Sequence, residues 1–362
     1  MNIIFIITGL NIGGAEKQVC ALADEFILLG HRVSIISLTG LSVVEPENRE
    51  VNIYELAMRK STLGLLQALW KAKKIILYHQ PDIIHSHMFH ANIFSRILRA
   101  FVKIPRLICT AHNTNEGGKL RMLLYRLTNF LSNVNTNVSE EAVYSFIMKR
   151  AVKPNKMLVM SNGIDACKFF YSEENRKLFR SRLSISDQQH LFIAIGRLQE
   201  QKDYQNLLYA FSLLLKERPL SYLIIVGDGP LKNKLIELAI KLNINKYTNF
   251  LGARNDISEI MSSCDTFVLS SKYEGFGLVV AEAMACQRYV VATDSGGVKS
   301  VLDKYGILVP IQDSKALSEA MKDSIDKDND EKYYLGLDAR NHIIKNFSIK
   351  EIASKWLNLY KR

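Results

Sequence analysis

Short apolar runs alternate along the chain with longer segments in which apolar residues recur every three or four positions. The runs are rich in Ile, Val and Leu and are typical of buried strands, whereas the second pattern is typical of amphipathic helices. In the first half, the pattern predicts helices at residues 16–29, 63–79, 92–101 and 140–149. It predicts strands at residues 2–8, 32–38, 52–56, 83–86, 107–111, 133–138 and 156–160. This alternation favours βαβ units and a mainly parallel sheet.

A second series of the same kind begins near His190. Strands are predicted at residues 190–195, 222–226, 248–251, 266–269, 289–292 and 307–309, and helices at 204–217, 231–242, 256–263 and 278–286. The charged stretch 168–187 is interpreted as the connection between the two series. The last part of the chain, residues 349–360, has the pattern of an amphipathic helix and follows a polar, strand-free stretch at 323–334.

The predicted fold class is therefore α/β, with two doubly wound Rossmann-like domains. We expect an N-terminal domain at residues 1–167 and a C-terminal domain at 168–345, with the helix at 346–362 packing back on the first domain. In doubly wound folds, ligands bind at the carboxyl ends of the strands, so we expect a central cleft where these edges face each other.

Composition is that of an ordinary globular protein of about two domains. The chain has 362 residues, of which 48% are hydrophobic and 23% charged. No apolar run reaches the roughly 18–20 residues of a membrane span, and residues 1–8 are interpreted as a core strand rather than a signal peptide. The five cysteines form no Cys-x-x-Cys pair, which argues against a zinc site and for a reducing cytoplasm.

The formal net charge of +11 is unevenly distributed. Residues 96–126 contain a single acid, Glu116, and are interleaved with hydrophobic residues. Their basic residues are Arg96, Arg99, Lys103, Arg106, Lys119, Arg121 and Arg126. Basic and apolar residues together favour contact with an anionic membrane surface over a nucleic-acid groove. The alternative is that Leu123, Leu124 and Leu127 pack inward and the basic residues are merely solvated.

The segment 270–286 offers the most specific chemistry. Glu274 follows a predicted strand, Gly275 and Gly277 form a turn into a helix, and Glu282 lies about two helical turns further on. Two carboxylates can hold hydroxyl groups, and bare amides at a helix N-terminus can hold phosphate. This combination suits a nucleotide sugar, although a strand, a glycine turn and a helix recur in many α/β proteins.

Further candidates lie at the ends of other predicted strands. Gly13 and Gly14 open a helix whose amides can face a phosphate, or form a mere tight turn. Arg197 and Lys202 arrive in one short loop, which suits a diphosphate unless both belong to a solvated face. His112 can offer a hydrogen bond or a proton, although a lone histidine is more often structural. The histidines at 85, 87 and 90 have no acid beside them and are interpreted as lining or loop residues.

In chain order, several motifs resemble those of the GT-B glycosyltransferases of family 4, and the resemblance covers almost the whole chain. They are Gly13-Gly14-Ala15-Glu16, Ser161-Asn162-Gly163-Ile164-Asp165, Gly196-Arg197-Leu198 with Lys202, Val226-Gly227-Asp228-Gly229-Pro230, and Glu274-Gly275-Phe276-Gly277 with Glu282-Ala283-Met284-Ala285. The resemblance implies retaining transfer from a nucleotide-diphosphate sugar, with no cofactor and no bound metal. The sequence is interpreted as containing no Asp-x-Asp motif to hold a metal, which agrees with this expectation. It also makes the N-terminal domain the acceptor-binding domain and the C-terminal domain the nucleotide-sugar-binding one.

The resemblance also implies roles for individual residues. Arg197 and Lys202 would neutralise the diphosphate, and Glu274 would orient the donor sugar rather than act as a nucleophile. His112 would be the histidine near the donor sugar, completing the expected catalytic group. The expected substrate-binding residues are Gly13, Gly14, Glu16, Gly252, Arg254, Gly275, Phe276, Gly277, Leu278 and Glu282. Within that group, Glu282 would hold the ribose, and Gly252 and Arg254 would flank the base.

The function expected from these residues is transfer of a hexose or N-acetylhexosamine, with a UDP-sugar favoured as donor, to a lipid-linked glycan acceptor. The expected pathway is bacterial O-antigen, lipopolysaccharide or capsule biosynthesis, at the inner face of the cell membrane. One departure from the family is Gln287, where a glycine is common, and only a local change in the helix cap is expected.

Two other classes of protein remain as alternatives. An NAD-dependent oxidoreductase would use a doubly wound sheet, but the first strand is not followed by Gly-x-Gly-x-x-Gly. A basic, non-catalytic RNA-binding protein would explain the charge, but the basic stretch lacks aromatic-rich strands, so no nucleic-acid partner is expected.

Overall fold

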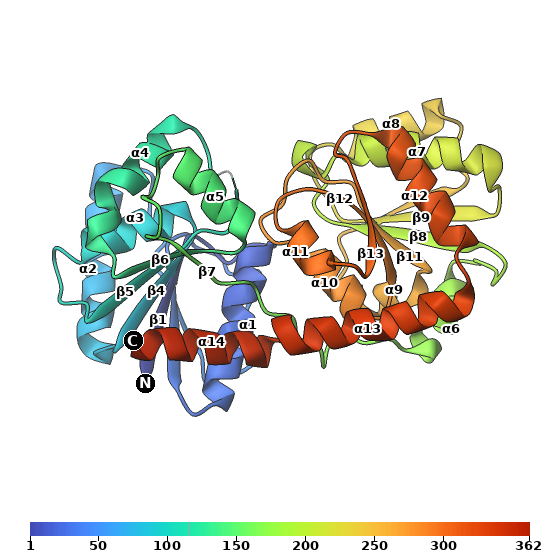
Figure 1. Ribbon diagram of the computed structural model, residues 1–362. Coiled ribbons are helices and arrows are strands. Elements are labelled where there is room, and N and C mark those ends of the chain that lie inside the picture. Colours follow the sequence, from blue (N-terminus) through green and yellow to red (C-terminus); the bar gives the residue numbers. More distant parts are fainter. Residues whose placement is uncertain (115) are drawn as a thin grey trace. The chain divides into compact units, whose positions relative to one another are not determined.

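The computed structural model describes residues 1–114 and 116–362, which form two compact units (Figure 1). Unit 1 comprises Met1–Gly163 together with Ile349–Arg362, and unit 2 comprises Ile164–Ser348. Each unit is an α/β layer structure built on a parallel sheet, as the hydrophobic pattern predicts. The observed division lies a few residues from the predicted boundaries at 167 and 345.

Unit 1 contains a seven-stranded parallel sheet in the order β3-β2-β1-β4-β5-β6-β7. The order reverses between β1 and β4, which is where ligands bind in doubly wound sheets. Every strand predicted for the first half is present. The central strands β1 and β4 are buried along their length, and β1 therefore forms a nearly unbroken apolar run. The strands are β1 (Asn2–Ile7), β2 (Arg32–Ser37), β3 (Asn52–Glu55), β4 (Ile83–His87), β5 (Arg106–Thr110), β6 (Val134–Asn137) and β7 (Leu158–Val159).

Helices cover this sheet in two groups. The helix α14 (Ile349–Lys361), at the end of the chain, packs against α1 (Gly14–Leu28), and together they bury Trp356 and Tyr360 in one core cluster. A second cluster lies under α2 (Thr62–His79) and α3 (Phe89–Leu98). In that group α2 packs against α3, which packs against α4 (Lys119–Thr128). The short helix η1 (Asn129–Leu131) and α5 (Glu140–Met148) complete the unit.

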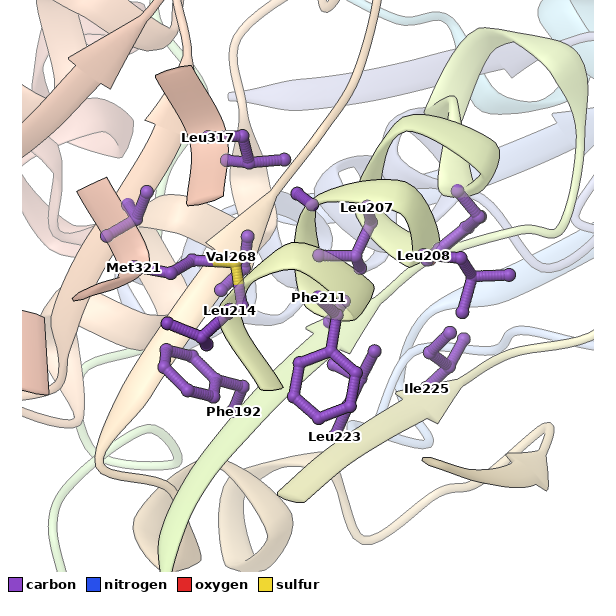
Figure 2. Packing of buried hydrophobic residues seen from close by; sticks show 14 of the residues in the cluster. Phe192, Leu207, Leu208, Phe211, Leu214, Leu223, Ile225, Val268, Leu317 and Met321 are labelled. Carbon is purple, nitrogen blue, oxygen red and sulfur yellow. The ribbon is translucent and has the colours of Figure 1, made fainter. Parts of the chain in front are cut away.

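Unit 2 contains a six-stranded parallel sheet in the order β10-β9-β8-β11-β12-β13. Figure 2 shows its core, where Phe192 and Leu223 of the sheet pack against Phe211 and Leu214 of one helix and Met321 of another. The strands are β8 (His190–Ile195), β9 (Ser221–Val226), β10 (Thr248–Gly252), β11 (Thr266–Leu269), β12 (Tyr289–Thr293) and β13 (Gly306–Val309). The helices are α6 (Glu173–Arg182), η2 (Glu200–Lys202), α7 (Tyr204–Glu217), α8 (Lys232–Lys241), α9 (Ile257–Ser263), α10 (Leu278–Ala285), α11 (Val298–Leu302), α12 (Ser314–Asp326) and α13 (Asn329–Phe347).

The interpretation of residues 168–187 as a connection is wrong. They contain α6, which packs against α9 inside unit 2. The high density of charged residues in α6 obscures the helical pattern in the sequence. Arg180 is nevertheless only 2% exposed. It donates to the carbonyls of Ser186 and Gln189, both at 2.6 Å, and to Asp265 at 3.1 Å. An arginine can be buried when its guanidinium group donates to several acceptors, because these hydrogen bonds replace those it made with water.

Candidate active site

The loops that follow β8 and β9 lie backbone to backbone at one edge of the sheet of unit 2. The amide of Leu198 donates to the carbonyl of Asp228 at 2.9 Å, and the amide of Gly227 donates to the carbonyl of Gly252 at 2.8 Å. Gly227 has φ +141°, and a Cβ there would lie 2.0 Å from the Gly196 oxygen. Only glycine permits this close approach.

At this edge, Lys202 and Glu274 form an ion pair. The Nζ of Lys202, at the end of η2, lies 2.6 Å from Oε1 of Glu274, which precedes α10. Their side chains are 15% and 10% exposed, so solvent screens the pair weakly. The hydroxyl of Ser271 donates to the same Oε1 at 2.6 Å. The structure therefore brings together two residues predicted to act on different parts of the donor.

Surrounding polar groups hold this pair in place. The hydroxyl of Ser270 donates to the Lys202 carbonyl at 2.9 Å, and that of Thr293 donates to the Ser271 carbonyl at 2.7 Å. Tyr204 donates to the Gly196 carbonyl at 3.1 Å, and burial, with the nearby Glu274 charge, raises the pKa of its hydroxyl. Sequence reasoning missed Ser271 and Tyr204, although Ser271 stands three positions before Glu274.

The helix α10 begins directly after the ion pair. Its N-cap residue, Gly277, has φ +90°, and no side chain caps the helix. Phe276 is buried and makes an edge contact with Phe347, with 5.4 Å between the ring centroids. Leu278 is the first residue of α10, and Glu282, further along the helix, is buried. A helix N-terminus without a side-chain cap presents amide hydrogens that suit phosphate.

The remaining predicted residues of unit 2 include two arginines, one of which already has an ion-pair partner. Arg197 is exposed and forms no ion pair among residues 1–114 and 116–362, so its guanidinium is available. Arg254 is already engaged, because its Nε and Nη2 donate to the two carboxylate oxygens of Asp256 at 2.8 and 2.5 Å. Gly252 lies at the end of β10 with φ +70°.

In unit 1, the predicted glycine turn begins α1. Gly13 is the N-cap residue, Gly14 is the first helical residue, and no side chain caps the helix. The carboxylate of Glu16 folds back towards the turn, since a Cβ at Gly13 would lie 2.3 Å from Glu16 Oε2. Glu16 is buried. A phosphate at this N-terminus would meet that carboxylate, so the turn suits an anion only if Glu16 turns away.

His112 follows β5 and is buried. Its amide donates to Oε1 of Glu116 at 3.0 Å, and its Nε2 lies 3.0 Å from Nδ1 of His87. Burial lowers the pKa of His112 to about 4, so the ring is neutral at neutral pH. His112 Nδ1 is buried and has no hydrogen-bond partner within the described part of the chain. A neutral ring can hydrogen-bond a sugar hydroxyl but carries no charge.

The interpretation of His85 and His87 as lining or loop residues is wrong. Both lie within β4 and are buried, because each finds a polar or aromatic partner inside the fold. His85 bonds the Tyr360 hydroxyl through Nδ1 at 2.7 Å and Thr110 Oγ1 through Nε2 at 2.6 Å. The described residues contain no group of His, Cys, Asp and Glu that could hold a metal ion.

An acidic run in unit 2 carries the spacing Asp-x-Asp, so the interpretation that the sequence contains no such motif is wrong. It comprises Asp326, Asp328 and Asp330. Asp328 caps α13 by accepting from the amides of Asp330 and Glu331 at 2.9 and 3.2 Å. Asp326 pairs with Arg218 at 2.7 Å. Asp328 is therefore engaged in a helix cap and Asp326 in an ion pair.

The basic stretch 96–126 is only partly a surface feature. Arg96 is buried and donates to Thr128 at 2.8 Å and to Asn135 at 2.6 Å. Main-chain carbonyls accept from three further guanidinium groups, those of Arg99, Arg106 and Arg121. Lys103, Lys119 and Arg126 are exposed.

The sequence also left open the alternative that the leucines of α4 pack inward, and most of them do not. Leu120, Leu123 and Leu127 are 70%, 46% and 59% exposed, whereas Leu124 is half-buried. Residues 96–127 therefore expose three cations together with three leucines of α4. None of the helices in the described parts of the chain has the length and apolar character to span a membrane. All five cysteines are free.

Two family models match this chain. The model described as Glycosyltransferase Family 4 matches residues 12–167, and the model described as Glycosyl transferases group 1 matches residues 175–346. Two doubly wound parallel-sheet units, matched in this order, define a glycosyltransferase of the GT-B fold. The chain belongs to family 4 of these enzymes.

Proteins of known activity are similar along most of the chain. UDP-Gal:alpha-D-GlcNAc-diphosphoundecaprenol alpha-1,3-galactosyltransferase of Escherichia coli is 27% identical over 325 residues, covering 85% of this chain and 81% of that protein. N-acetylgalactosamine-N,N'-diacetylbacillosaminyl-diphospho-undecaprenol 4-alpha-N-acetylgalactosaminyltransferase of Campylobacter jejuni is 26% identical over 351 residues, covering 91% of each. The solved structure of Anabaena HepE with UDP and glucose has a TM-score of 0.87 at 20% identity, covering 100% of this chain and 99% of that one.

Proposed function

We propose that this glycosyltransferase moves a hexose or N-acetylhexosamine from a UDP-sugar to a lipid-linked glycan acceptor, with retention of configuration and without a metal ion. The observation that carries the proposal is the weakly exposed Lys202–Glu274 pair at the uncapped N-terminus of α10. The similar Escherichia coli and Campylobacter jejuni enzymes are named for acceptors that carry a diphospho-undecaprenol group. The proposed setting is bacterial O-antigen, lipopolysaccharide or capsule biosynthesis, at the inner face of the cell membrane.

The ion pair suggests how the donor engages unit 2. Lys202 exchanges its carboxylate partner for a phosphate oxygen of the donor, and the exposed guanidinium of Arg197 binds the same diphosphate. Glu274 then has a free oxygen for hydroxyls of the sugar, and the amides of residues 275–278 face the phosphates. Glu282 holds the ribose, and Gly252 and Arg254 flank the base.

The transfer step separates charge between the sugar and the leaving group. As the bond from the anomeric carbon to the diphosphate breaks, positive charge builds on the sugar and negative charge on the leaving phosphate. Lys202, Arg197 and the α10 amides stabilise that negative charge in a setting of low solvent exposure. The acceptor hydroxyl attacks on the same face, and its proton passes to the leaving phosphate. We propose that unit 1 contributes His112, Glu16 and the amides of Gly13 and Gly14 to binding.

The proposal also includes contact with an anionic membrane through residues 96–126. The groups available for it are Lys103, Lys119 and Arg126 with the exposed leucines of α4. Cations attract acidic head groups, and leucines partition into the interface.

The test is a transfer assay with a panel of UDP- and GDP-sugars and lipid-diphosphate acceptors, with products identified by mass spectrometry. Lys202→Met and Glu274→Gln enzymes are compared with Lys322→Met, which removes a lysine from exposed ion pairs in the same unit. The proposal expects transfer from a UDP-sugar by the wild type and by Lys322→Met, and a large loss in the other two. Unchanged transfer by Lys202→Met and Glu274→Gln would refute the site, and exclusive use of GDP-sugars would refute the donor.

A further inference from the structure

The helix α2 of unit 1 carries large apolar residues on its outward face as well as on its inward face. Its inward residues, Gly64, Ala68, Leu69, Ala72 and Ile76, are buried. Its outward face has a second apolar row, whose first four residues lie three, four and seven positions apart. That row comprises Leu63, Leu66, Trp70, Leu77 and Tyr78, which are 64%, 59%, 58%, 56% and 82% exposed. A surface helix ordinarily carries mainly polar residues there, and large apolar residues gathered on an exposed face mark an interaction site.

The same segment carries only positive charge. Between Glu55 and Asp82 the chain contains no acid, and its basic residues are Arg59, Lys60, Lys71, Lys73 and Lys74. The ammonium group of Lys74 lies 3.5 Å from the centroid of the Trp70 ring. The row of apolar side chains and the lysines therefore share one exposed side of the helix.

A pocket of about 390 Å³ adjoins this face, between α2 and the edge strand β3. Lys71 and Lys74 line it from α2, and Tyr54 and Glu55 line it from β3. The Glu55 carboxylate is already engaged, since it accepts from the amide and hydroxyl of Ser42 at 2.7 and 2.6 Å, and these bonds lower its pKa. The Lys71 ammonium donates to the Leu56 carbonyl at 3.4 Å and keeps two further N–H groups, so the pocket offers two ammonium groups beside the apolar row.

We propose that α2 docks the enzyme on a bilayer that contains anionic lipids. Trp70 and the leucines enter the interface between head groups and acyl chains, and Lys71 and Lys74 bind lipid phosphates. This surface is distinct from the stretch 96–126 of the proposed function, although α2, α3 and α4 form one layer of unit 1 (Figure 1). The inference needs neither a particular donor nor the transfer chemistry, so vesicle binding and sugar transfer can fail separately.

Charge favours a lipid surface over two other occupants. A second copy of the chain would place an acid-free cationic face against the same face, and the two would repel each other. A nucleic acid would be attracted by the lysines, but it would leave the row of leucines without an apolar partner. Anionic lipids satisfy both features of the helix.

The chain provides its own reporter for the test. Its two tryptophans are Trp70, which is exposed, and Trp356, which is 2% exposed. A Trp356→Phe enzyme therefore reports Trp70 alone. With vesicles of phosphatidylglycerol and phosphatidylcholine, we expect a blue shift of its emission and protection from acrylamide. With pure phosphatidylcholine, we expect little change. Acrylamide quenching of the wild-type enzyme gives the same readout if the Trp356→Phe enzyme is unstable.

Variants then separate α2 from other surfaces in a vesicle co-sedimentation assay. Lys71→Gln with Lys74→Gln should weaken binding about fivefold per lysine, and Leu66→Ser with Leu77→Ser should weaken it at least as much. The matched control is Ile240→Ser on α8 of unit 2, 55% exposed, which should bind as the wild type does. Transfer to a detergent-dispersed acceptor should stay unchanged in all of them.

Three outcomes would overturn the inference. They are vesicle binding that survives both pairs of α2 substitutions, loss of binding only when Leu120 and Leu123 of α4 are replaced, and burial of Trp70 through dimerisation without vesicles, detected by light scattering. Far-ultraviolet circular dichroism before each assay excludes unfolded variants.

Discussion

At the scale of single residues, the main finding is that Lys202 and Glu274 are partners before any donor binds. Sequence reasoning gave them separate roles, one on the diphosphate and one on the sugar. Their 2.6 Å contact and low exposure mean that neither charge is independent of the other. A nearly buried charge that loses its partner is costly, so substitutions at either position act on stability as well as on chemistry.

Lys202→Met removes the cation and keeps most of the apolar stem. We expect kcat/KM for transfer to fall about 10²–10³-fold, as for other groups that stabilise developing negative charge. We also expect the unfolding free energy to fall by about 3–5 kcal/mol, because Glu274 stays behind unpaired. Both are measured on one preparation, by initial rates and by urea denaturation.

The double variant Lys202→Met with Glu274→Gln separates the two effects. Stability should return towards that of the wild type because no unpaired charge remains, whereas transfer should stay low. As a control, Lys322→Met breaks a pair with Glu217, whose side chain is 54% exposed, and should cost less than about 1 kcal/mol. Recovery of transfer in the double variant would contradict the role of Lys202.

At the scale of elements, the end of α10 shows what the departure from the family means. Gln287 follows the C-cap residue and has φ +58°, a left-handed conformation that glycine adopts most easily. The amides of Gln287 and Arg288 donate to the carbonyls of Met284 and Ala283, both at 2.9 Å. The helix therefore ends as it would with glycine, at the expense of some backbone strain.

Gln287→Gly should raise the unfolding free energy by up to about 1 kcal/mol, since it removes the strain of a left-handed non-glycine residue. Transfer should be unchanged because the position lies at the opposite end of α10 from Glu274. Gln287→Ala keeps the Cβ and should give no such gain. A destabilised Gln287→Gly enzyme would show that the Gln287 side chain is structurally required.

The helix α14 is the other informative element, because it belongs to unit 1 although unit 2 precedes it in the chain. Trp356 is buried against the His85 ring, with 4.4 Å between centroids, and Tyr360 donates to or accepts from the same histidine. The amphipathic pattern of residues 349–360 predicts a helix, but only the fold shows which core it completes.

Trp356→Ala should therefore destabilise unit 1 by about 3–5 kcal/mol through the cavity it leaves. Hydrogen exchange read by mass spectrometry should show faster exchange in α1, β1 and α14, with β8 and α7 of unit 2 unaffected. Trp70→Ala, at an exposed site on α2, is the control and should change stability by less than about 0.5 kcal/mol. Uniformly faster exchange in both units would contradict this assignment of α14.

At the scale of the whole molecule, each unit buries a histidine that is neutral in the fold. Burial lowers the pKa of His112 in unit 1 and of His190 in unit 2 to about 4, from an ordinary value of 6.5. Below pH 6.5 the unfolded chain takes up protons that the folded chain does not, so stability falls as pH falls from 6.5 to 4. In unit 1, burial raises the pKa of Glu116, which acts in the opposite direction.

We therefore expect the unfolding free energy to be nearly level between pH 6.5 and about pH 8 and to decrease from pH 6.5 to pH 4. His190 alone contributes about 2 kcal/mol of this loss at pH 5. The measurement is urea denaturation at pH 7, 6 and 5 for the wild type and for His190→Gln. The variant should lose less stability between pH 7 and 5, and parallel profiles would refute the contribution of His190.

Much of the fold could be predicted because its signals are local. Strands such as β1 and β8 are buried on both faces and appear in the sequence as unbroken apolar runs, and glycines mark the turns that follow them. The helix α6 gave no such signal, because charged residues dominate it, and its Arg180 is buried where it finds hydrogen-bond acceptors elsewhere in the fold.

The sequence by itself determined the two doubly wound units, the family, and the strand ends at which candidate residues such as Arg197, Lys202 and Glu274 lie. Only the tertiary structure decided which charges are free. Lys202 meets a carboxylate 72 positions away, and Arg96 meets Asn135 39 positions away. Burial and ion pairing depend on neighbours that folding brings together. The sequence of a basic stretch therefore does not reveal which of its arginines are buried and which of its lysines are exposed. The same holds for α2. Its sequence does not show which apolar residues are exposed, and the structure shows it because the other face of the helix fills the core.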